Sequence, residues 1–234
     1  MSRDRRSRAA DKSYFCGPME TVIIAGEKLL LHPDRAIYWP ARRMLLLADL
    51  HLGKGAHFRR AGIAVPRGVS SVNFLRLAGL LEEFGPERVL LLGDLFHSDH
   101  NHVWGDFCAF TAARPAIRFE LVPGNHDVLP PHCYEEARLV CHPEIITEGP
   151  FSLSHHPLTE ERRPAGQYNL CGHVHPCVRL LDGSGRSMKL PSFYFGSNEG
   201  ILPAFGEFTG CAEVKVRPGD RVFVLAEDAV LAVS

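Results

Sequence analysis

The sequence lacks several features that would assign the protein to a class at once. No apolar run in its 234 residues approaches the length of a membrane span, and the first eight residues lack the apolar core of a signal peptide. The seven cysteines are scattered and include no C-x-x-C pair. That pattern favours reduced thiols in a cytosol-like compartment over a disulfide framework, so we expect a soluble cytoplasmic protein.

The sequence also lacks a strong net charge, which is −1. This excludes a protein that coats nucleic acid over its whole surface. The basic residues are nevertheless uneven. An N-terminal arm over residues 1–18 is rich in arginine, and we expect it to be a disordered, solvated tail. A second basic group contains Lys54, Arg59, Arg60 and Arg67.

No internal repeat or low-complexity linker divides the chain, so residues 19–234 are predicted to form one domain. Apolar spacing predicts helices over 69–84 and 103–113. Short strands are predicted on either side of them, at 21–25, 28–31, 36–39, 177–181, 187–190, 192–195, 212–216 and 221–225. Strands alternate with helices in the first half, and strands alone follow in the second. This predicts an α/β fold of two sheets packed face to face with helices outside.

Five short polar segments contain residue types that bind metals: Asp49-Leu50-His51, Gly93-Asp94 with His97 three residues on, Gly124-Asn125-His126-Asp127, Ser154-His155-His156-Pro157 and Gly172-His173-Val174-His175. Four of them follow apolar runs predicted as buried strands, at 44–48, 89–92, 117–122 and 151–154. A strand that ends in a polar residue delivers it to the carboxyl edge of a sheet, where open α/β sheets build their sites. One such segment is weak evidence, but five in this order indicate a two-metal phosphoesterase site.

A pair of divalent ions needs a bridging ligand, and the carboxylate of Asp94 is the natural choice. The other candidates form two shells: Asp49, His51 and His175 for one ion, and Asn125, His155 and His173 for the other. Oxygen and imidazole ligands without thiolate select against structural zinc and iron–sulfur sites, and they suit manganese, iron or catalytic zinc. In a loop, the two imidazoles of 173–175 can each reach a different ion.

Two ions roughly 3.5–4 Å apart lower the pKa of a bridging water, and the resulting hydroxide attacks phosphorus. No activated serine, cysteine or threonine is needed. His126, beside Asn125, is predicted to face the leaving oxygen as general acid. Gly93 and Gly124 fit places where the backbone passes close to metal or phosphate, although turn geometry alone would also explain them.

The constellation resembles the calcineurin-like metallophosphoesterase superfamily over residues 44–176. The resemblance implies a two-sheet α/β metallophosphoesterase sandwich flanked by helices, with the ligand roles given above and His126 as general acid. Two departures leave alternatives open. Where many relatives carry a carboxylate that orients the catalytic histidine, this chain has His97. Asp99 or Asp127 then orients His126, or His97 contacts phosphate or a ligand. His155 and His156 both compete for one ligand position, and the family pattern favours His155.

Shorter segments resemble the ligase-associated DNA damage response endonucleases of the PdeM type, at 49–54, 58–62, 66–68, 93–98 and 202–206. That resemblance implies a bacterial, manganese-dependent phosphodiesterase that acts as a DNA endonuclease in DNA repair. It also implies association with an ATP-dependent DNA ligase, a helicase and an exonuclease. By position, Lys54, Arg59, Arg67 and His97 are the candidates for contacts with single-stranded or flexible DNA.

Two other functions compete with this interpretation. A phosphomonoesterase or small-nucleotide phosphohydrolase could use the same metal site, because the flanking arginines do not exclude it. A non-catalytic scaffold should have lost ligands or the acid histidine, whereas this chain retains all of them.

Overall fold

The computed structural model describes residues 18–55, 69–96, 102–181, 183, 185–207, 209–226 and 228–233. The predicted basic arm lies outside these residues apart from Pro18, so its disorder stays a prediction. None of the helices in the described parts of the chain combines the length and the apolar character needed to cross a membrane.

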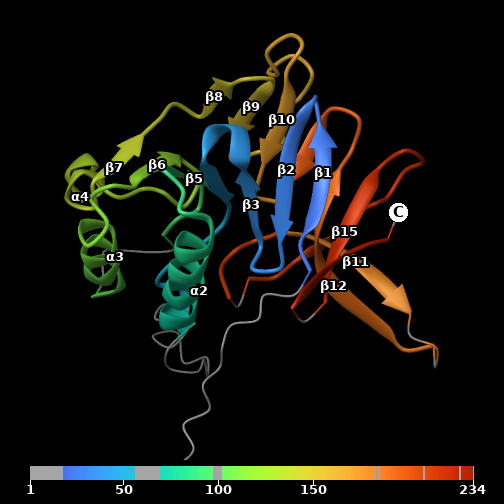
Figure 1. The fold of residues 1–234 in the computed structure, drawn as a ribbon, viewed down its shortest axis with the longest axis horizontal. Coiled ribbons are helices and arrows are strands. Elements are labelled where there is room, and N and C mark those ends of the chain that lie inside the picture. Colours follow the sequence, from blue (N-terminus) through green and yellow to red (C-terminus); the bar gives the residue numbers. More distant parts are fainter. Residues whose placement is uncertain are drawn as a thin grey trace, which may run out of the picture.

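The first sheet has seven strands, which lie in the order of the sequence. Figure 1 labels β1 to β3 and β5 to β7 of this sheet. Its first four strands pair antiparallel and the last four pair parallel, so β4 belongs to both halves. The strands are β1 (Glu20–Ile24), β2 (Glu27–His32), β3 (Ala36–Trp39), β4 (Met44–Leu47), β5 (Arg88–Leu92), β6 (Arg118–Val122) and β7 (Leu139–Cys141). A short 3-10 helix, η1 (Pro40–Arg42), joins β3 to β4.

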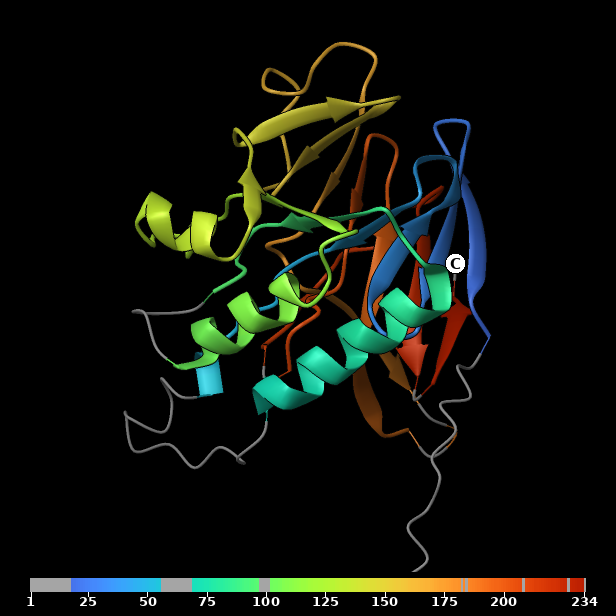
Figure 2. The same ribbon diagram turned by 60° about the vertical axis from the view of Figure 1, so that its left-hand side comes forward.

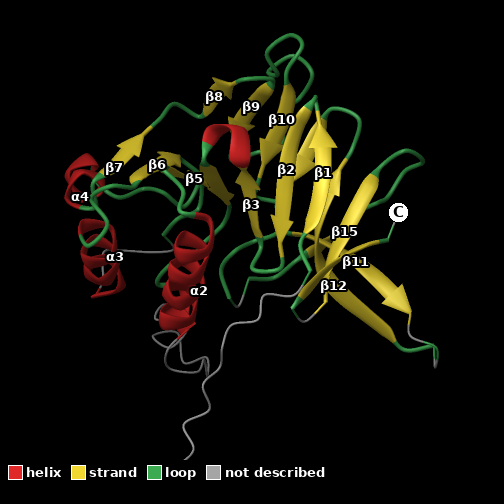
Figure 3. Ribbon diagram, in the orientation of Figure 1, coloured by secondary structure: helices red, strands yellow, loops and turns green. Residues whose placement is uncertain are grey.

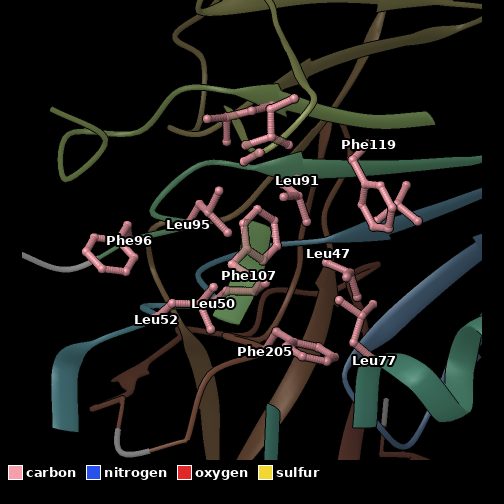
Figure 4. Packing of buried hydrophobic residues seen from close by; sticks show 14 of the residues in the cluster. Leu47, Leu50, Leu52, Leu77, Leu91, Leu95, Phe96, Phe107, Phe119 and Phe205 are labelled. Atoms are coloured by element: carbon pink, nitrogen blue, oxygen red, sulfur yellow. The ribbon is translucent and has the colours of Figure 1, made fainter. Parts of the chain in front are cut away.

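Helices connect the parallel strands and cover one face of this sheet. They are α2 (Val69–Phe84), α3 (His102–Ala112) and α4 (Pro131–Glu136). Figure 2 shows α2 and α3 lying side by side, and Phe74 of α2 contacts Phe107 and Phe110 of α3. Leu77 and Phe107 from these helices pack against Leu47 and Leu91 of the sheet (Figure 4).

The second sheet has nine strands, and seven of them follow the order β14-β11-β12-β13-β10-β9-β8. The remaining two, β15 and β16, extend from β12. Its strands, drawn in yellow in Figure 3, are β8 (Ile145–Glu148), β9 (Phe151–Ser154), β10 (Tyr168–Cys171), β11 (Pro176–Leu181), β12 (Ser187–Phe195), β13 (Glu199–Ile201), β14 (Ala212–Glu213), β15 (Arg221–Ala226) and β16 (Ala229–Ala232).

A second core fills the space between the two sheets. Leu46 of β4 and Leu90 of β5 meet Leu153 of β9, Leu170 of β10 and Phe193 of β12 there. Because successive side chains of a strand point to opposite faces, the neighbours of Leu46 and Leu90 face the helices instead. The central strands are therefore buried on both faces, which explains their uninterrupted apolar runs.

The predicted α/β sandwich is confirmed, and the observed bounds of α2 match the predicted helix. Several details differ, and strands β7, β8, β13 and β16 were not predicted. The predicted strands at 187–190 and 192–195 are one strand, in which Pro191 lies where pairing passes from β11 to β15. The strand predicted over 212–216 ends at Glu213. Strand β10 was missed because its buried Asn169 interrupts the apolar pattern; its amide donates to Ser152 O and Ser154 Oγ.

The expectation that the thiols stay reduced is wrong for one pair, because Cys177 and Cys211 form a disulfide. Cys177 is buried, and it is bonded rather than free. The two cysteines are 34 residues apart in sequence, and the contact arises only because β14 returns beside β11. No local spacing motif in the sequence predicts a disulfide between these two cysteines.

The doubly buried strands should dominate stability. Leu90→Ala removes a side chain of 0% exposure from the core between the sheets, which should cost about 2–5 kcal/mol. Leu75→Ala on α2 makes the same change at a side chain that is 60% exposed and should cost less than about 0.5 kcal/mol. Urea denaturation of the metal-free protein measures both; equal losses would contradict the two-sided core.

Candidate metal centre

The described residues of the five polar segments lie at one edge of the sandwich, each segment just after a strand. Asp49 follows β4, Asp94 follows β5, Asn125 follows β6, and His155 follows β9 directly. The sequence predicted these four placements. His173 follows β10, so the fifth segment also begins where a strand ends. The structure thus brings together all seven predicted ligands: Asp49, His51, Asp94, Asn125, His155, His173 and His175.

The side chains of the first two segments are divided between the site and the core. Leu50, Leu52, Leu95 and Phe96 are buried in the cluster beneath the helices (Figure 4). The backbone between the two loops continues the sheet ladder, with Leu52 N–H donating to Leu95 O at 2.9 Å. The polar residues between these anchors are therefore directed away from the helix-side core, toward the site.

Five of the predicted ligands have a left-handed backbone, which residues other than glycine rarely adopt. The φ angles are 55° at Asp49, 45° at His51, 50° at Asp94, 66° at His173 and 51° at His175. Such conformations persist only where the surroundings impose them, and they cluster at functional sites. Here the hydrogen bonds of Asp49 N–H to Gly93 O (3.1 Å) and of His51 N–H to Asp94 O (2.9 Å) help impose them.

His175, Asp49 and His51 form a first group of possible ligands. His175 Nε2 lies 3.3 Å from Asp49 Oδ1 and 3.3 Å from His51 Nε2. Its Nδ1–H donates to Gly210 O at 2.9 Å, which directs the lone pair of the neutral ring, on Nε2, toward the other two side chains. Burial by itself lowers the pKa of His175, but the hydrogen bond and charge of Asp49 raise it overall. The group attracts positive charge.

His155, Asn125 and His173 form a second group. His155 Nδ1–H donates to Leu92 O at 3.0 Å, so the lone pair is again on Nε2. That nitrogen lies 3.2 Å from Asn125 Oδ1 and 3.1 Å from His173 Nδ1. Burial and the neighbouring His155 lower the pKa of His173, which keeps its ring neutral and able to bind a metal.

The Asp94 carboxylate lies between the two groups. Its Oδ2 is 3.8 Å from His51 Nε2, and its Oδ1 is 3.4 Å from His155 Nε2. The side chain is almost fully buried and also accepts the His126 N–H at 3.0 Å. This is the position that a bridging carboxylate requires.

The chemistry of the donors fits a pair of divalent cations. Lone pairs of imidazole nitrogens and carboxylate oxygens converge, and two pairs of ring nitrogens lie 3.3 and 3.1 Å apart. Nitrogens this close need a proton or a cation between them. Among the described residues, possible ligand atoms lie within 4.8 Å of one another in three groups: Asp49, His51 and His175; Asp49, Asp94 and His155; and His155, His156 and His173. Oxygen and nitrogen ligands suit manganese, iron or catalytic zinc.

The structure separates the two candidates in the fourth segment. His155 is 1% exposed and faces Asp94, whereas His156 is exposed, with its ring centroid 4.1 Å from that of His173. Burial and the adjacent imidazoles lower the pKa of His156. His155 is therefore the buried candidate that faces Asp94, and His156 lies at the rim, where it belongs to a group of possible ligands with His155 and His173.

His126 lies at the open side of the centre. Its side chain is 41% exposed, and Nε2 is 4.0 Å from Asp94 Oδ2. Asp127, one of the residues considered for orienting His126, braces two loops of the site by accepting backbone hydrogen bonds from both. Its Oδ1 accepts the N–H of Leu95 at 3.0 Å, and its Oδ2 accepts that of Gly124 at 2.8 Å. Burial raises the pKa of Asp127 to about 6.

The two glycines of the motifs allow this close approach. A Cβ at Gly93 would collide with the imidazole of His155, and one at Gly124 would collide with the carboxylate and backbone of Asp94. Gly93 also has a φ of 76°. Close packing against ligands, rather than turn geometry alone, therefore accounts for both glycines.

The segment at 202–206 lies behind the first ligand loop and supports it. The sequence indicated this segment only through a resemblance of its residues, without a structural role. Phe205 N–H donates to Ala48 O at 2.8 Å, and Gly206 N–H donates to Asp49 O at 3.0 Å. Arg76 donates to Phe205 O at 2.7 Å and Arg35 donates to Gly206 O at 3.2 Å, so the segment is held from its other side. Its role is to fix the backbone of Asp49.

Of the predicted substrate-binding residues, only Lys54 lies within the described residues. Burial lowers the pKa of Lys54, while the charges of Asp94 and Asp49 act in the opposite direction. Its amine is therefore close enough to the centre to interact with both carboxylates. Arg59, Arg67 and His97 lie outside the described residues, as does Asp99.

Comparison with known proteins finds a matching family and a similar solved structure. The family described as calcineurin-like phosphoesterase matches residues 42–151. The crystal structure of the nuclease MPE from Pseudomonas putida is 30% identical with a TM-score of 0.78, covering 92% of this chain and 100% of that one. No curated protein sequence gives a significant match.

Two further solved structures are more distant. A protein of unknown function from Aquifex aeolicus is 23% identical with a TM-score of 0.39, covering 56% of this chain and 78% of that one. The phosphoesterase Yfce from E. coli is 14% identical with a TM-score of 0.39, covering 80% and 90%. Both scores are too low to bear on function. The family match over four of the ligands and the similarity along the whole Pseudomonas nuclease lead to one conclusion: this chain is a hydrolase of the calcineurin-like phosphoesterase family.

Proposed function

We propose that the chain is a two-metal phosphodiesterase that cleaves DNA internally, with His126 as general acid. The position of Asp94 between two groups of candidate ligands is the observation that carries the proposal, because two ions held side by side stabilise both the attacking and the leaving oxygen of an in-line displacement at phosphorus. The similarity to the Pseudomonas putida nuclease supports a nucleic acid as substrate.

When bound, the two ions would lower the pKa of a water molecule and neutralise charge on the phosphate. One ion would be held by Asp49, His51 and His175. The other would be held by Asn125, His155 and His173, and Asp94 would contact both ions. The donor set is compatible with manganese, iron or zinc, and we propose manganese on the resemblance of the short sequence segments. Gly210 O and Leu92 O hold the Nδ1 protons of His175 and His155, which keeps each Nε2 available.

His126 is suited to protonating the leaving oxygen. Its backbone N–H is bonded to Asp94, so the residue is fixed relative to the proposed bridge, while its ring extends to the exposed side of the centre. The bracing carboxylate of Asp127 joins the His126 loop to the Asp94 loop and keeps this spacing constant. A partly exposed imidazole can release a proton to substrate and recover it from solvent.

Two hollows flank the centre and support a diester over a monoester. One, of about 380 Å³, is lined by Asn125, His156 and Arg162 on the side of β9. The other, of about 180 Å³, is lined by His175 and Lys189 on the side of β11. In the second sheet, β9 and β11 lie on opposite sides of β10, whose loop carries two of the ligands. A phosphodiester carries two substituents, and each can lie in one of the two hollows. A phosphomonoester carries a single substituent, which would occupy only one hollow.

We propose that the backbone of single-stranded or flexible DNA is contacted by Lys54, Arg59 and Arg67. His97 would make a contact near the phosphate. A place in DNA repair in the bacterial cytoplasm, with an ATP-dependent DNA ligase, a helicase and an exonuclease as functional partners, rests on the same resemblance.

One parallel assay tests the function. Purified protein with Mn²⁺ is given an aryl phosphodiester, an aryl phosphomonoester and circular single-stranded DNA. We expect hydrolysis of the diester and cutting of the circle, which has no ends and so reports internal cleavage. Turnover of the monoester alone would favour the phosphomonoesterase alternative.

Replacing the proposed bridge should remove metal as well as activity. Asp94→Ala leaves both groups short of a ligand, so we expect fewer than two tightly bound ions and loss of diester cleavage. Asp106→Ala, at an exposed aspartate of α3, is the control and should bind metal normally. Elemental analysis measures the metal; two tightly bound ions in Asp94→Ala would refute the assignment.

Replacing His126 should separate catalysis from metal binding. His126→Ala should retain two ions and lose activity, with a larger loss on DNA than on a nitrophenyl diester, because the DNA leaving group is more basic. General acid catalysis is commonly worth about 10²–10⁴-fold. Val128→Ala in the same loop, at a side chain that is 76% exposed, is the control. Equal losses on the two substrates would remove His126 from this role.

The basic residues after the first ligand loop should act on DNA alone. Arg59→Ala or Arg67→Ala should weaken DNA cleavage, spare a small diester and flatten the salt dependence of single-strand binding by about 0.7 in log–log slope. Deleting residues 1–12 should matter less. Loss of DNA cleavage on that deletion, with no effect of the arginine replacements, would contradict this DNA path.

A further inference from the structure

The Cys177–Cys211 disulfide lies beside the proposed metal centre. Cys177 is two residues after His175, and Cys211 directly follows Gly210. Gly210 supplies the carbonyl that accepts the Nδ1–H of His175 at 2.9 Å. The disulfide therefore joins the segment that carries a predicted ligand to the segment that orients it.

Backbone contacts continue this attachment on both sides of the bond. Ala212 N–H donates to His175 O at 3.0 Å, and Val214 N–H donates to Cys177 O at 2.9 Å. Together with the Gly210 contact, they hold residues 210–214 along the start of β11. The result is a fixed ring orientation at His175, with Nε2 3.3 Å from Asp49 Oδ1.

The noncovalent part of this attachment is short and mostly exposed, apart from Val214, which packs partly buried against a hydrophobic cluster. Strand β14 is only two residues long, and both are exposed. The ion pairs of Glu213 with Arg179 (3.0 Å) and Lys189 (3.5 Å) join exposed side chains and contribute little. Short exposed strands open readily, so the covalent bond is the constraint that keeps the Gly210 carbonyl near His175 when this pairing opens.

We propose that Cys177 and Cys211 are positioning residues of the metal centre, and that their disulfide makes metal binding redox-dependent. The inference rests on the proposed two-metal function. In the oxidised protein the Gly210 carbonyl fixes the His175 ring, and the group of Asp49, His51 and His175 binds its ion tightly. In the reduced protein residues 210–214 loosen and that group binds its ion less tightly, whereas the group of Asn125, His155 and His173 is unaffected.

The switch is accessible to reductants. Cys211 is exposed although Cys177 is buried, so a reductant can attack the sulfur of Cys211. A phosphine forms a bond to that sulfur as the S–S bond breaks, and the Cys177 sulfur leaves with the electron pair and takes a proton. Water then hydrolyses the phosphine adduct to the phosphine oxide, which leaves Cys211 as a thiol. A dithiol gives the same two thiols and is itself oxidised to a disulfide.

The test compares Mn²⁺ binding by oxidised and phosphine-reduced full-length protein, measured by calorimetry and by the electron paramagnetic resonance signal of free Mn²⁺. Thiol titration should find two more thiols after reduction than before. We expect reduction to lower the binding affinity for one of the two ions by about 10–100-fold. This is the usual effect of losing the partner that orients a ligating histidine. Cys211→Ser should bind like the reduced protein under either condition. Cys141→Ser, at an exposed free cysteine, should bind like the wild type.

The other possible results would each contradict the proposal. Two ions bound with unchanged affinities after reduction, equal weakening of both ions, or an unchanged thiol count would overturn the redox inference and leave the two-metal function standing. Oxidised wild-type protein that bound fewer than two ions would overturn both. Because the reduced wild-type chain carries no substitution, misfolding of a variant cannot decide the outcome.

Discussion

The contacts of Asp94 on both sides constrain the rest of the structure. One carboxylate lies 3.8 Å from His51 and 3.4 Å from His155, so three strand-end loops must meet within the reach of a single short side chain. Side chains at Gly93 and Gly124 would fill the space that this meeting needs. The left-handed backbone at Asp49, His51 and Asp94 is a cost of the same convergence.

The fold supplies the rigidity that such a centre requires. Strands β4 and β5 are packed on one face by helices and on the other by the second sheet, so their ends have little freedom to move apart. Asp127 ties the Asp94 loop to the Asn125 loop, and the segment at 202–206 fixes the backbone of Asp49. Ligands held in this way need little rearrangement when an ion binds.

Features with a local signal could be predicted from the sequence, and those made by distant segments could not. Apolar runs ending in aspartate, asparagine or histidine located β4, β5, β6 and β9 and the candidate ligands that follow them. Strand β10 escaped because Asn169 is polar yet buried, satisfied by partners that the sequence does not reveal. The bracing bonds of Asp127 and the Cys177–Cys211 disulfide also depend on segments that meet only after folding.

The central claim is that Asp94 lies between two ions, each held by its own group of ligands. Anomalous diffraction from crystals grown with Mn²⁺ tests it most directly. The account predicts two peaks roughly 3.5–4 Å apart, the two-metal spacing. One should lie within bonding distance of Asp49, His51 and His175, the other of Asn125, His155 and His173, with Asp94 touching both. A single peak, or two peaks with Asp94 bound to only one, would contradict it.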